Sequence, residues 1–232
     1  MIFILIILTT LSFQILSNLA NDYGDGIKGT DNSDRIGPMR ALQSGIISIN
    51  KMRFAIALNA LISTVLTFIL ILMTFGLDQL VYILIFLALG GLSIYAAISY
   101  TVGKSAYGYK ALGDLMVFLF FGLLSVLGTF FLFAQHLDAL LLLPASSVGF
   151  LSAAVLNLNN MRDLDSDRKS NKSTLAGYLG PKYAKVYHFI LIILAILSML
   201  AFQFIMSFST IIFITWVVPG TLACAEICSR VR

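Results

Sequence analysis

Charge is scarce in this sequence. Asp, Glu, Lys and Arg make up 11% of the 232 residues, whereas 59% are hydrophobic. Soluble domains carry about 25% charged residues, so the composition excludes an ordinary soluble protein. Cysteine is rare as well, with two residues, which excludes a secreted scaffold held by many disulfides. The composition therefore predicts a membrane protein.

Several long stretches contain no charged residue at all. Each is about 20 residues long, the length that a helix needs to cross the hydrocarbon core of a bilayer. An outer-membrane barrel would instead show strands of about 10 residues with alternating polarity, and this pattern is absent. The sequence thus predicts an all-α fold, a polytopic transmembrane helical bundle with about seven spans. The charge-free windows are 2–20, 54–77, 80–98, 115–134, 139–158, 186–206 and 208–225.

The first window is interpreted as a span and not as a cleaved leader. It has no basic region before its apolar core, and the residues after Ala20 are rich in Asp and Gly.

The basic residues are confined to alternate connections between the predicted spans. Of the 15 Lys and Arg, five lie in 21–53, two in 99–113, six in 159–185 and two in 230–232. The connections near 78, 136 and 207 contain none. The positive-inside rule therefore predicts that the basic connections and the carboxyl end are cytoplasmic. The net charge is +4, but the basic residues form no compact basic domain and no nucleic-acid motif, so no nucleic-acid partner is expected.

Acidic residues gather in two of these basic connections. If the first span continues as a helix, Asn21, Asp22 and Asp25 share one face, and Asp163 and Asp167 share a face in the same way. Asp165 would point away from Asp163 and toward solvent. Seven of the 11 acidic residues belong to the two clusters: Asp22, Asp25, Asp31, Asp34, Asp163, Asp165 and Asp167.

Such clusters suit a hard divalent cation. Two carboxylates one helical turn apart repel each other unless a cation lies between them, and Mg²⁺ is commonly held by carboxylates together with substrate phosphates. Interleaved Lys and Arg residues complement the charge of a leaving phosphate. For either acidic cluster taken alone, the alternative to a metal site is a solvent-exposed turn. A transporter would place ionisable groups inside its spans, and none lies near the middle of a window.

Three stretches resemble the motifs of the UbiA-type intramembrane prenyltransferases. They are NDYGDGIKGTD (21–31) with RIGPMR (35–40), YTVGK (100–104) with YGY (107–109) and LGD (112–114), and NNMRDLDSDRKSNKSTL (159–175). Within that family they look most like the branch that uses 1,4-dihydroxy-2-naphthoate. The resemblance implies a single membrane domain over 1–232 with a nine-helix fold. One further span is expected beyond each end of this chain. The two Asp motifs are expected to face each other across a cavity on the cytoplasmic side of a bacterial inner membrane.

The resemblance also implies roles for individual residues. Position 29 is Gly where the family pattern has an acidic residue, so either Asp31 takes over that role or the role is absent. The implied catalytic residues are Asn21, Asp25, Tyr100, Lys104, Asp163 and Asp167. The implied substrate-binding residues are Asp22, Arg40, Asn160, Arg162 and Lys172. The implied ligands of Mg²⁺ are Asp22, Asp25, Asp31, Asp163 and Asp167.

The activity implied is transfer of a polyprenyl group from polyprenyl diphosphate to 1,4-dihydroxy-2-naphthoate, with release of CO₂ and diphosphate and formation of demethylmenaquinol. Two alternatives stay open. One is another aromatic acceptor, 4-hydroxybenzoate or homogentisate; the other is a non-catalytic membrane remnant or metal carrier. Prenyl chain length and oligomeric state have no signal in the sequence.

Overall fold

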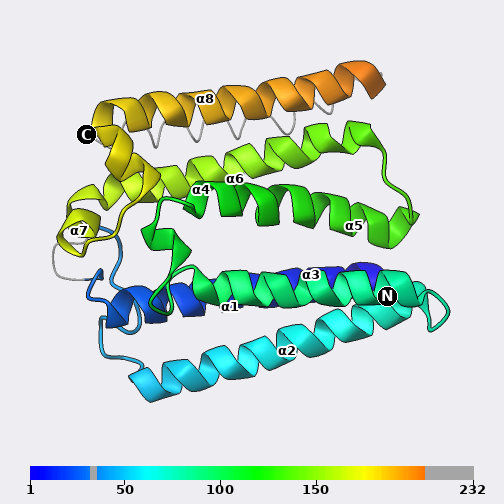
Figure 1. Ribbon diagram of the computed structural model, residues 1–232, viewed down its shortest axis with the longest axis horizontal. Helices are drawn as coiled ribbons and strands as arrows, with labels where there is room; N and C mark the ends of the chain where they lie inside the picture. The colour runs from blue at the N-terminus through cyan, green and yellow to red at the C-terminus, as the bar shows by residue number, and fades with distance from the viewer. Residues whose placement is uncertain (32–35, 207–232) are drawn as a thin grey trace. The chain divides into compact units, whose positions relative to one another are not determined.

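The computed structural model describes residues 1–31 and 36–206. They contain helices and no strand, so the predicted all-α fold is confirmed (Figure 1). The elements are α1 (Ile2–Ile27), α2 (Ile49–Phe75), α3 (Leu80–Ser99), η1 (Tyr107–Tyr109), α4 (Gly113–Val117), η2 (Phe118–Leu124), α5 (Ser125–Ala134), η3 (Ala139–Leu141), α6 (Leu142–Arg162), α7 (Leu164–Lys169) and α8 (Leu175–Met206).

Six helical stretches are long and apolar enough to cross a membrane, and they coincide with six of the seven predicted spans. They cover 2–27, 49–75, 80–99, 113–134, 139–162 and 175–206. The seventh predicted span, 208–225, lies outside the described residues. The chain is thus an integral membrane protein built of helices.

The chain divides into two compact units. Unit 1 comprises 1–110 and 169–172, and unit 2 comprises 111–168 and the chain from 173 onward. Each is described here by itself. A single domain over 1–232 stays a prediction.

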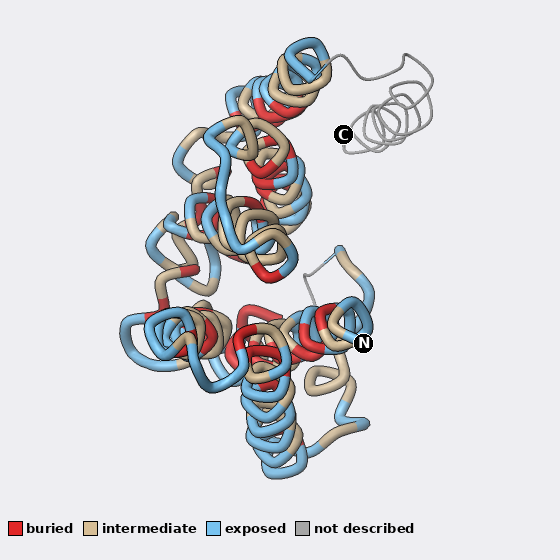
Figure 2. The backbone as a smooth tube through the Cα atoms, turned by 90° about the vertical axis from the view of Figure 1, so that its right-hand side faces the viewer, coloured by how far each residue is buried: buried red, intermediate tan, exposed pale blue. Residues whose placement is uncertain are grey.

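Unit 1 is formed by α1, α2 and α3, which pack against one another. From Ile6 to Tyr23 the buried residues of α1 include one every three or four positions, which places these on one face of the helix, and burial widens at its end with Gly24 and Asp25. On that face the Ser12 hydroxyl is hydrogen-bonded to the Ser63 hydroxyl of α2. The exposed residues of these helices include many Phe, Leu and Ile, as expected of helices in contact with lipid. Figure 2 marks the exposed and buried positions along the backbone.

Unit 2 is organised around α6, which packs against α8, α4, η2 and α5. Small residues on α6 allow this close approach. A Cβ added to Gly122 of η2 would lie 2.5 Å from the Cα of Gly149 on α6. Along α8, the contact is made by Ala153 and Ala154 of α6 with Leu191 and Ile192.

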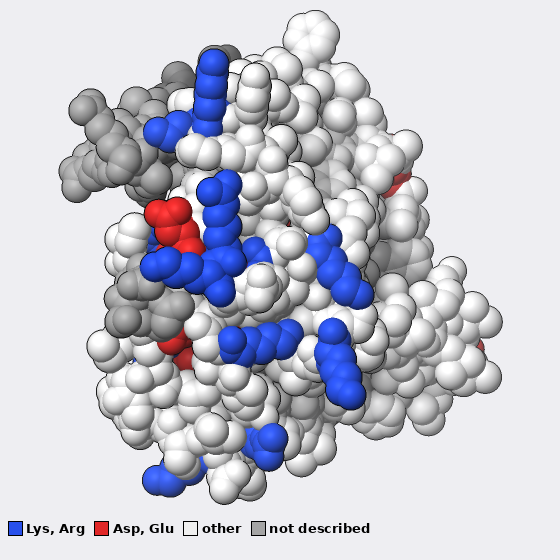
Figure 3. Space-filling model, turned by 60° about the vertical axis from the view of Figure 1, so that its left-hand side comes forward, with Lys and Arg blue, Asp and Glu red and all other residues white. Residues whose placement is uncertain are grey.

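In unit 1 the charged connections meet at one end of the helices. Because α1, α2 and α3 alternate in direction, the end of α1, the start of α2 and the end of α3 lie together, and the short connection at 76–79 lies at the opposite end (Figure 1). Basic side chains are prominent on the face drawn in Figure 3, and few acidic ones reach its surface. In unit 1, this end therefore holds the first acidic motif and the connection that follows α3.

Candidate functional site

The first acidic motif lies on the last two turns of α1. The helix runs on to Ile27, so the condition under which Asn21, Asp22 and Asp25 would share one face is met. Asp25 is only 1% exposed. Because Asn21 and Asp25 are four residues apart, their side chains leave the same face of the helix. A buried carboxylate is costly unless it is paired, so its neighbours decide what it can do.

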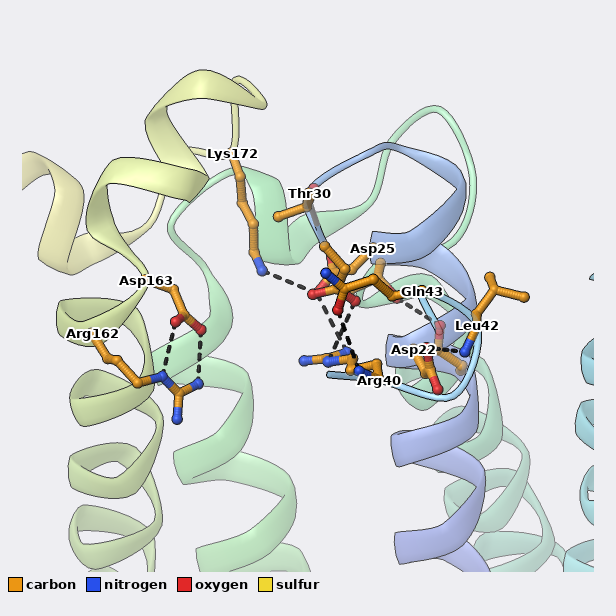
Figure 4. Close-up of polar contacts among 12 residues, drawn as sticks. Asp22, Asp25, Thr30, Arg40, Leu42, Gln43, Arg162, Asp163 and Lys172 are labelled. Carbon is orange, nitrogen blue, oxygen red and sulfur yellow. Dashed lines mark hydrogen bonds and ion pairs between the residues drawn. The ribbon is translucent and has the colours of Figure 1, made fainter. Parts of the chain in front are cut away.

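Two basic side chains meet one oxygen of the Asp25 carboxylate. Lys172 Nζ lies 3.2 Å from Asp25 Oδ2, and Arg40 Nη1 lies 3.7 Å from the same atom (Figure 4). Arg40 also places its Nε 3.4 Å from Asp31 Oδ2, so one guanidinium joins two buried carboxylates. The structure thus brings together four residues that were predicted separately: Asp25, Asp31, Arg40 and Lys172.

The second oxygen of Asp25 meets a tyrosine. The Tyr109 hydroxyl donates to Asp25 Oδ1 at 2.8 Å and lies 2.6 Å from Thr30 Oγ1. Neither Tyr109 nor Thr30 was given a role from the sequence. The signal available was the YGY segment at 107–109, which lies in a polar connection together with YTVGK.

Lys28 completes the surroundings of Asp25. Its ammonium lies 3.9 Å from the centre of the Tyr109 ring, which is a cation–π contact. Partial burial lowers the pKa of Lys28; the Asp25 carboxylate opposes this shift and Lys172 adds to it. Three basic residues therefore surround one buried carboxylate, and this arrangement can attract an anion as well as hold the carboxylate.

Asp22 points to a different partner. Its Oδ1 accepts a hydrogen bond from the backbone amide of Leu42 at 3.4 Å (Figure 4). The contact fixes the connection after α1 against the helix that precedes it. The predicted role of Asp22 in binding substrate or metal stays a prediction.

Tyr100 and Lys104 lie on the connection after α3, in unit 1. The Tyr100 ring stacks edge-on against Tyr107 at 5.3 Å between ring centres, and burial raises the pKa of Tyr107, with Tyr100 adding to the effect. Lys104 is exposed. No polar contact links Lys104 to the Asp25 cluster in the described part of the chain, so its predicted contact with diphosphate stays a prediction.

The close fit of this connection against α1 depends on Gly24. A Cβ at Gly24 would lie 2.3 Å from Oγ1 of Thr101, whose hydroxyl donates to the carbonyl of Ala20 at 2.9 Å. The glycine between Tyr23 and Asp25 is therefore required by packing.

The second acidic motif lies in unit 2, where α6 ends. Asp163 was expected to share one helix with Asp167. It lies instead at the break between α6 and α7, with φ of −96° and ψ of 13°. The amide of Asp167 still donates to the carbonyl of Asp163 at 2.8 Å, so the helical spacing of four persists. Asp167 and Asn160 are buried, while Asp165 is exposed as predicted.

Arg162 binds Asp163 through two parallel hydrogen bonds. Its Nε and Nη2 donate to Oδ1 and Oδ2 of the carboxylate, each at 2.8 Å (Figure 4). This geometry is the strong, bidentate form of an arginine–carboxylate pair. In this structure Arg162 therefore neutralises Asp163 before any substrate is bound.

The oxygen atoms of unit 1 suit a hard cation. Asn21 Oδ1 is buried and accepts no hydrogen bond within the described residues, and Asp25 presents a carboxylate one turn later on the same face. Among residues 1–31 and 36–206, no group of three His, Cys, Asp or Glu side chains lies close enough to hold a metal ion. The donor set fits Mg²⁺ together with phosphate oxygens, which commonly supply the remaining ligands.

Comparison with known proteins agrees with these motifs. The chain is 45% identical over 202 residues to the 1,4-dihydroxy-2-naphthoate octaprenyltransferase of Haemophilus influenzae, covering 87% of this chain and 65% of that protein. It is 48% identical over 185 residues to the protein of the same name from Escherichia coli, covering 80% of this chain and 59% of that protein. For the Mycobacterium tuberculosis protein of that name, identity is 35% over 210 residues, or 89% of this chain and 65% of that protein.

The chain thus spans between 59% and 65% of the length of these relatives. No solved structure gives a significant match. The sequence profile of the UbiA prenyltransferase family matches residues 1–232. The acidic motifs, the basic residues around them and the apolar helices that carry them are therefore those of a member of the UbiA prenyltransferase family.

Proposed function

We propose that the protein transfers a polyprenyl group from polyprenyl diphosphate to 1,4-dihydroxy-2-naphthoate, as a step in menaquinone biosynthesis. The observation that carries the proposal is the identity of 45% and 48% with two bacterial proteins named as octaprenyltransferases for this acceptor. The buried Asp25, with cations on one side and a neutral donor on the other, supports the same reaction class. The prenyl length in those names belongs to the relatives.

The residues that would hold Mg²⁺ in unit 1 are Asn21, Asp22, Asp25 and Asp31, and in unit 2 they are Asp163 and Asp167. Bound Mg²⁺ supplies positive charge that neutralises the diphosphate and makes it a better leaving group. Lys172 and Arg40 already lie beside Asp25, so they are placed to take up the phosphate oxygens. In unit 2, Arg162 is a further candidate to bind phosphate oxygens, since its guanidinium already binds the Asp163 carboxylate through two nitrogen atoms.

The proposed reaction forms one bond and breaks two. The allylic carbon of the prenyl chain leaves the diphosphate oxygen, and the ring carbon that bears the carboxyl group bonds to it. The carboxyl group then departs as CO₂, and its electron pair restores the aromatic ring. The side chains of the site stabilise the negative charge that develops on the diphosphate, and no covalent bond to the protein is needed.

We further propose that the protein lies in a bacterial cytoplasmic membrane with both acidic motifs on the cytoplasmic side. The positive-inside rule supports this orientation, since the described Lys and Arg lie in alternate connections or in the parts of α2, α6 and α8 next to them. A prenyl tail dissolved in the bilayer and a water-soluble acceptor could then meet at the ends of the spans.

The test is conversion of 1,4-dihydroxy-2-naphthoate and a polyprenyl diphosphate by membranes that contain the protein, expressed from the open reading frame that includes these residues. We expect a prenylated naphthoquinol with Mg²⁺ and none with chelator. Asp25→Asn should lower the rate by about 100-fold or more, because it removes the charge at the centre of the cluster. Asp165→Asn, at an exposed position in the other motif, is the matched control and should be neutral.

Each alternative has its own outcome. Product formed only from 4-hydroxybenzoate or homogentisate would move the proposal to another acceptor. Tight binding of Mn²⁺ and diphosphate without release of diphosphate from any prenyl substrate would favour a non-catalytic carrier.

A further inference from the structure

We infer that Tyr109 is a positioning residue, whose hydroxyl holds one oxygen of Asp25 so that the other oxygen is the one offered to cations. The inference rests on the proposed function, because it assigns Tyr109 to the carboxylate that would bind metal and diphosphate. Tyr109 belongs to η1 and approaches Asp25 from 84 residues away in the sequence.

The direction of the hydrogen bonds is fixed by the number of hydrogens. A tyrosine hydroxyl has one hydrogen, and at Tyr109 it points to Asp25 Oδ1 at 2.8 Å. The contact of 2.6 Å between Tyr109 and Thr30 must then be donated by Thr30. Two hydrogen bonds thus run in series from Thr30 through Tyr109 to Asp25, and each bond in such a series strengthens the next.

The two carboxylate oxygens consequently have different partners. Oδ1 accepts from a neutral phenol, and Oδ2 lies 3.2 Å from Lys172 and 3.7 Å from Arg40. A neutral donor restrains rotation of the carboxylate without cancelling its charge, whereas a lysine at the same place would do both. Because Asp25 is 1% exposed and Thr30 is 3% exposed, water has little access to replace this donor.

The Tyr109 ring is also near two lysine ammonium groups. Lys28 lies 3.9 Å from the centre of its ring, and Lys172 lies 5.6 Å from the same point. The preceding residue, Gly108, allows η1 to fit against Tyr100, since a Cβ there would lie 2.6 Å from the Tyr100 carbonyl oxygen. Tyr100 therefore shapes the turn that presents Tyr109.

The experiment compares Tyr109→Phe with Tyr107→Phe in the purified full-length protein. Both changes remove one hydroxyl from η1, but that of Tyr107 donates to the backbone carbonyl of Ala96 at 2.7 Å and not to a carboxylate. Mn²⁺ is titrated by electron paramagnetic resonance in the presence of inorganic diphosphate. We expect the dissociation constant for Mn²⁺ to rise about tenfold in Tyr109→Phe and to be unchanged in Tyr107→Phe.

Kinetics provide a second readout. The Mg²⁺ concentration for half-maximal rate should rise in Tyr109→Phe, with a smaller loss of kcat at saturating Mg²⁺, since a misplaced ligand weakens binding more than it alters the filled site. Thr30→Val, which leaves Asp25 and Tyr109 intact but removes the donor to Tyr109, should shift the same quantities in the same direction by less. This variant tests the two hydrogen bonds in series even if Tyr109→Phe is unstable.

Two results separate this inference from the proposed function. Wild-type Mn²⁺ affinity in both Tyr109→Phe and Thr30→Val, with Asp25→Asn defective, would overturn the role of Tyr109 and leave the proposed function standing. An unaltered protein that neither binds Mn²⁺ with diphosphate nor forms product would overturn both.

Discussion

Lys172 stands where a metal ion would be attracted. Its ammonium lies 3.2 Å from Asp25 Oδ2, and the Lys172 side chain is 9% exposed. A buried carboxylate is costly unless it is paired, and Lys172 supplies a cation from the protein itself. Under the proposed function, the same ammonium would bind a diphosphate oxygen once it has left Asp25. Lys172 can therefore oppose a free metal ion and assist a metal–diphosphate pair.

Replacing Lys172 with Met should have opposite effects on these two equilibria. Without diphosphate, the affinity for Mn²⁺ should rise several-fold, because a competing charge has left Oδ2. With diphosphate, affinity should fall, because a phosphate ligand is lost. Spectroscopic titration of the purified protein measures both, and Lys51→Met, at an exposed position of α2, is the control. Weaker Mn²⁺ binding in both conditions would show that Lys172 does not compete.

At the scale of helices, the contact of η2 with α6 leaves no room for a side chain. Residues 118–124 form a π-helical stretch inside the span 113–134, and Gly122 in it faces Gly149 of α6. A wider helical turn of this kind displaces the backbone locally. The absence of a Cβ at both positions is what allows the two backbones to touch.

Gly122→Ala should destabilise unit 2. Its new Cβ would lie 2.5 Å from the Gly149 Cα and 2.9 Å from the Ala145 carbonyl oxygen, neither of which can move without its helix. Overpacking of this kind costs about 1–3 kcal/mol. Gly128→Ala is the matched control in α5, where the added Cβ would meet only Leu124 Cδ1 at 3.9 Å. Thermal unfolding in detergent compares the two, and equal midpoints would contradict the packing argument.

Helix positions followed from the sequence wherever the bilayer imposes them. The window 80–98 became α3 nearly unchanged, and 54–77 lies largely within α2, which begins earlier and carries Lys51 and Arg53 near its start. The middle of a spanning helix must exclude charge, so the windows locate it. The break at Asp163 and the turn at Gly180, with φ of 73°, could not be seen in a pattern of polarity. Both depend on local backbone geometry that polarity does not report.

The site was foreseen in part for a similar reason. Asp25, Arg40 and Lys172 were predicted from residue type and motif, and their proximity is confirmed. The contact of Tyr109 with Asp25 was missed, because it joins segments 84 residues apart and only the fold decides that they meet. Asp34, in the first acidic cluster, lies outside the described residues.

At the scale of the whole molecule, the alternation of charge along the chain predicts its orientation. In unit 1 the connection after α3 and the connection between α2 and α3 lie at opposite ends of the helices. The first carries Lys104 and Lys110, and the second carries no basic residue. The positive-inside rule assigns the first to the cytoplasm.

Cysteine labelling tests this orientation in intact cells. In a background with Cys224 and Cys228 replaced by serine, Lys104→Cys should resist an impermeant maleimide, while Asp78→Cys should react. Both positions are exposed, so burial does not explain a difference. Permeabilised cells, in which both should react, are the control. Labelling of Lys104→Cys but not of Asp78→Cys in intact cells would contradict the predicted orientation.

The ion pair of Lys172 with Asp25 also constrains how the protein is made. The two residues are 147 positions apart. At about 5–20 residues per second of synthesis, the ribosome reaches Lys172 roughly 7 to 30 seconds after Asp25. Throughout that interval Asp25 lacks one of the cations that it has in the finished protein. Until Lys172 is synthesised, Arg40 is the one of these two ion-pair partners that can already meet Asp25 Oδ2.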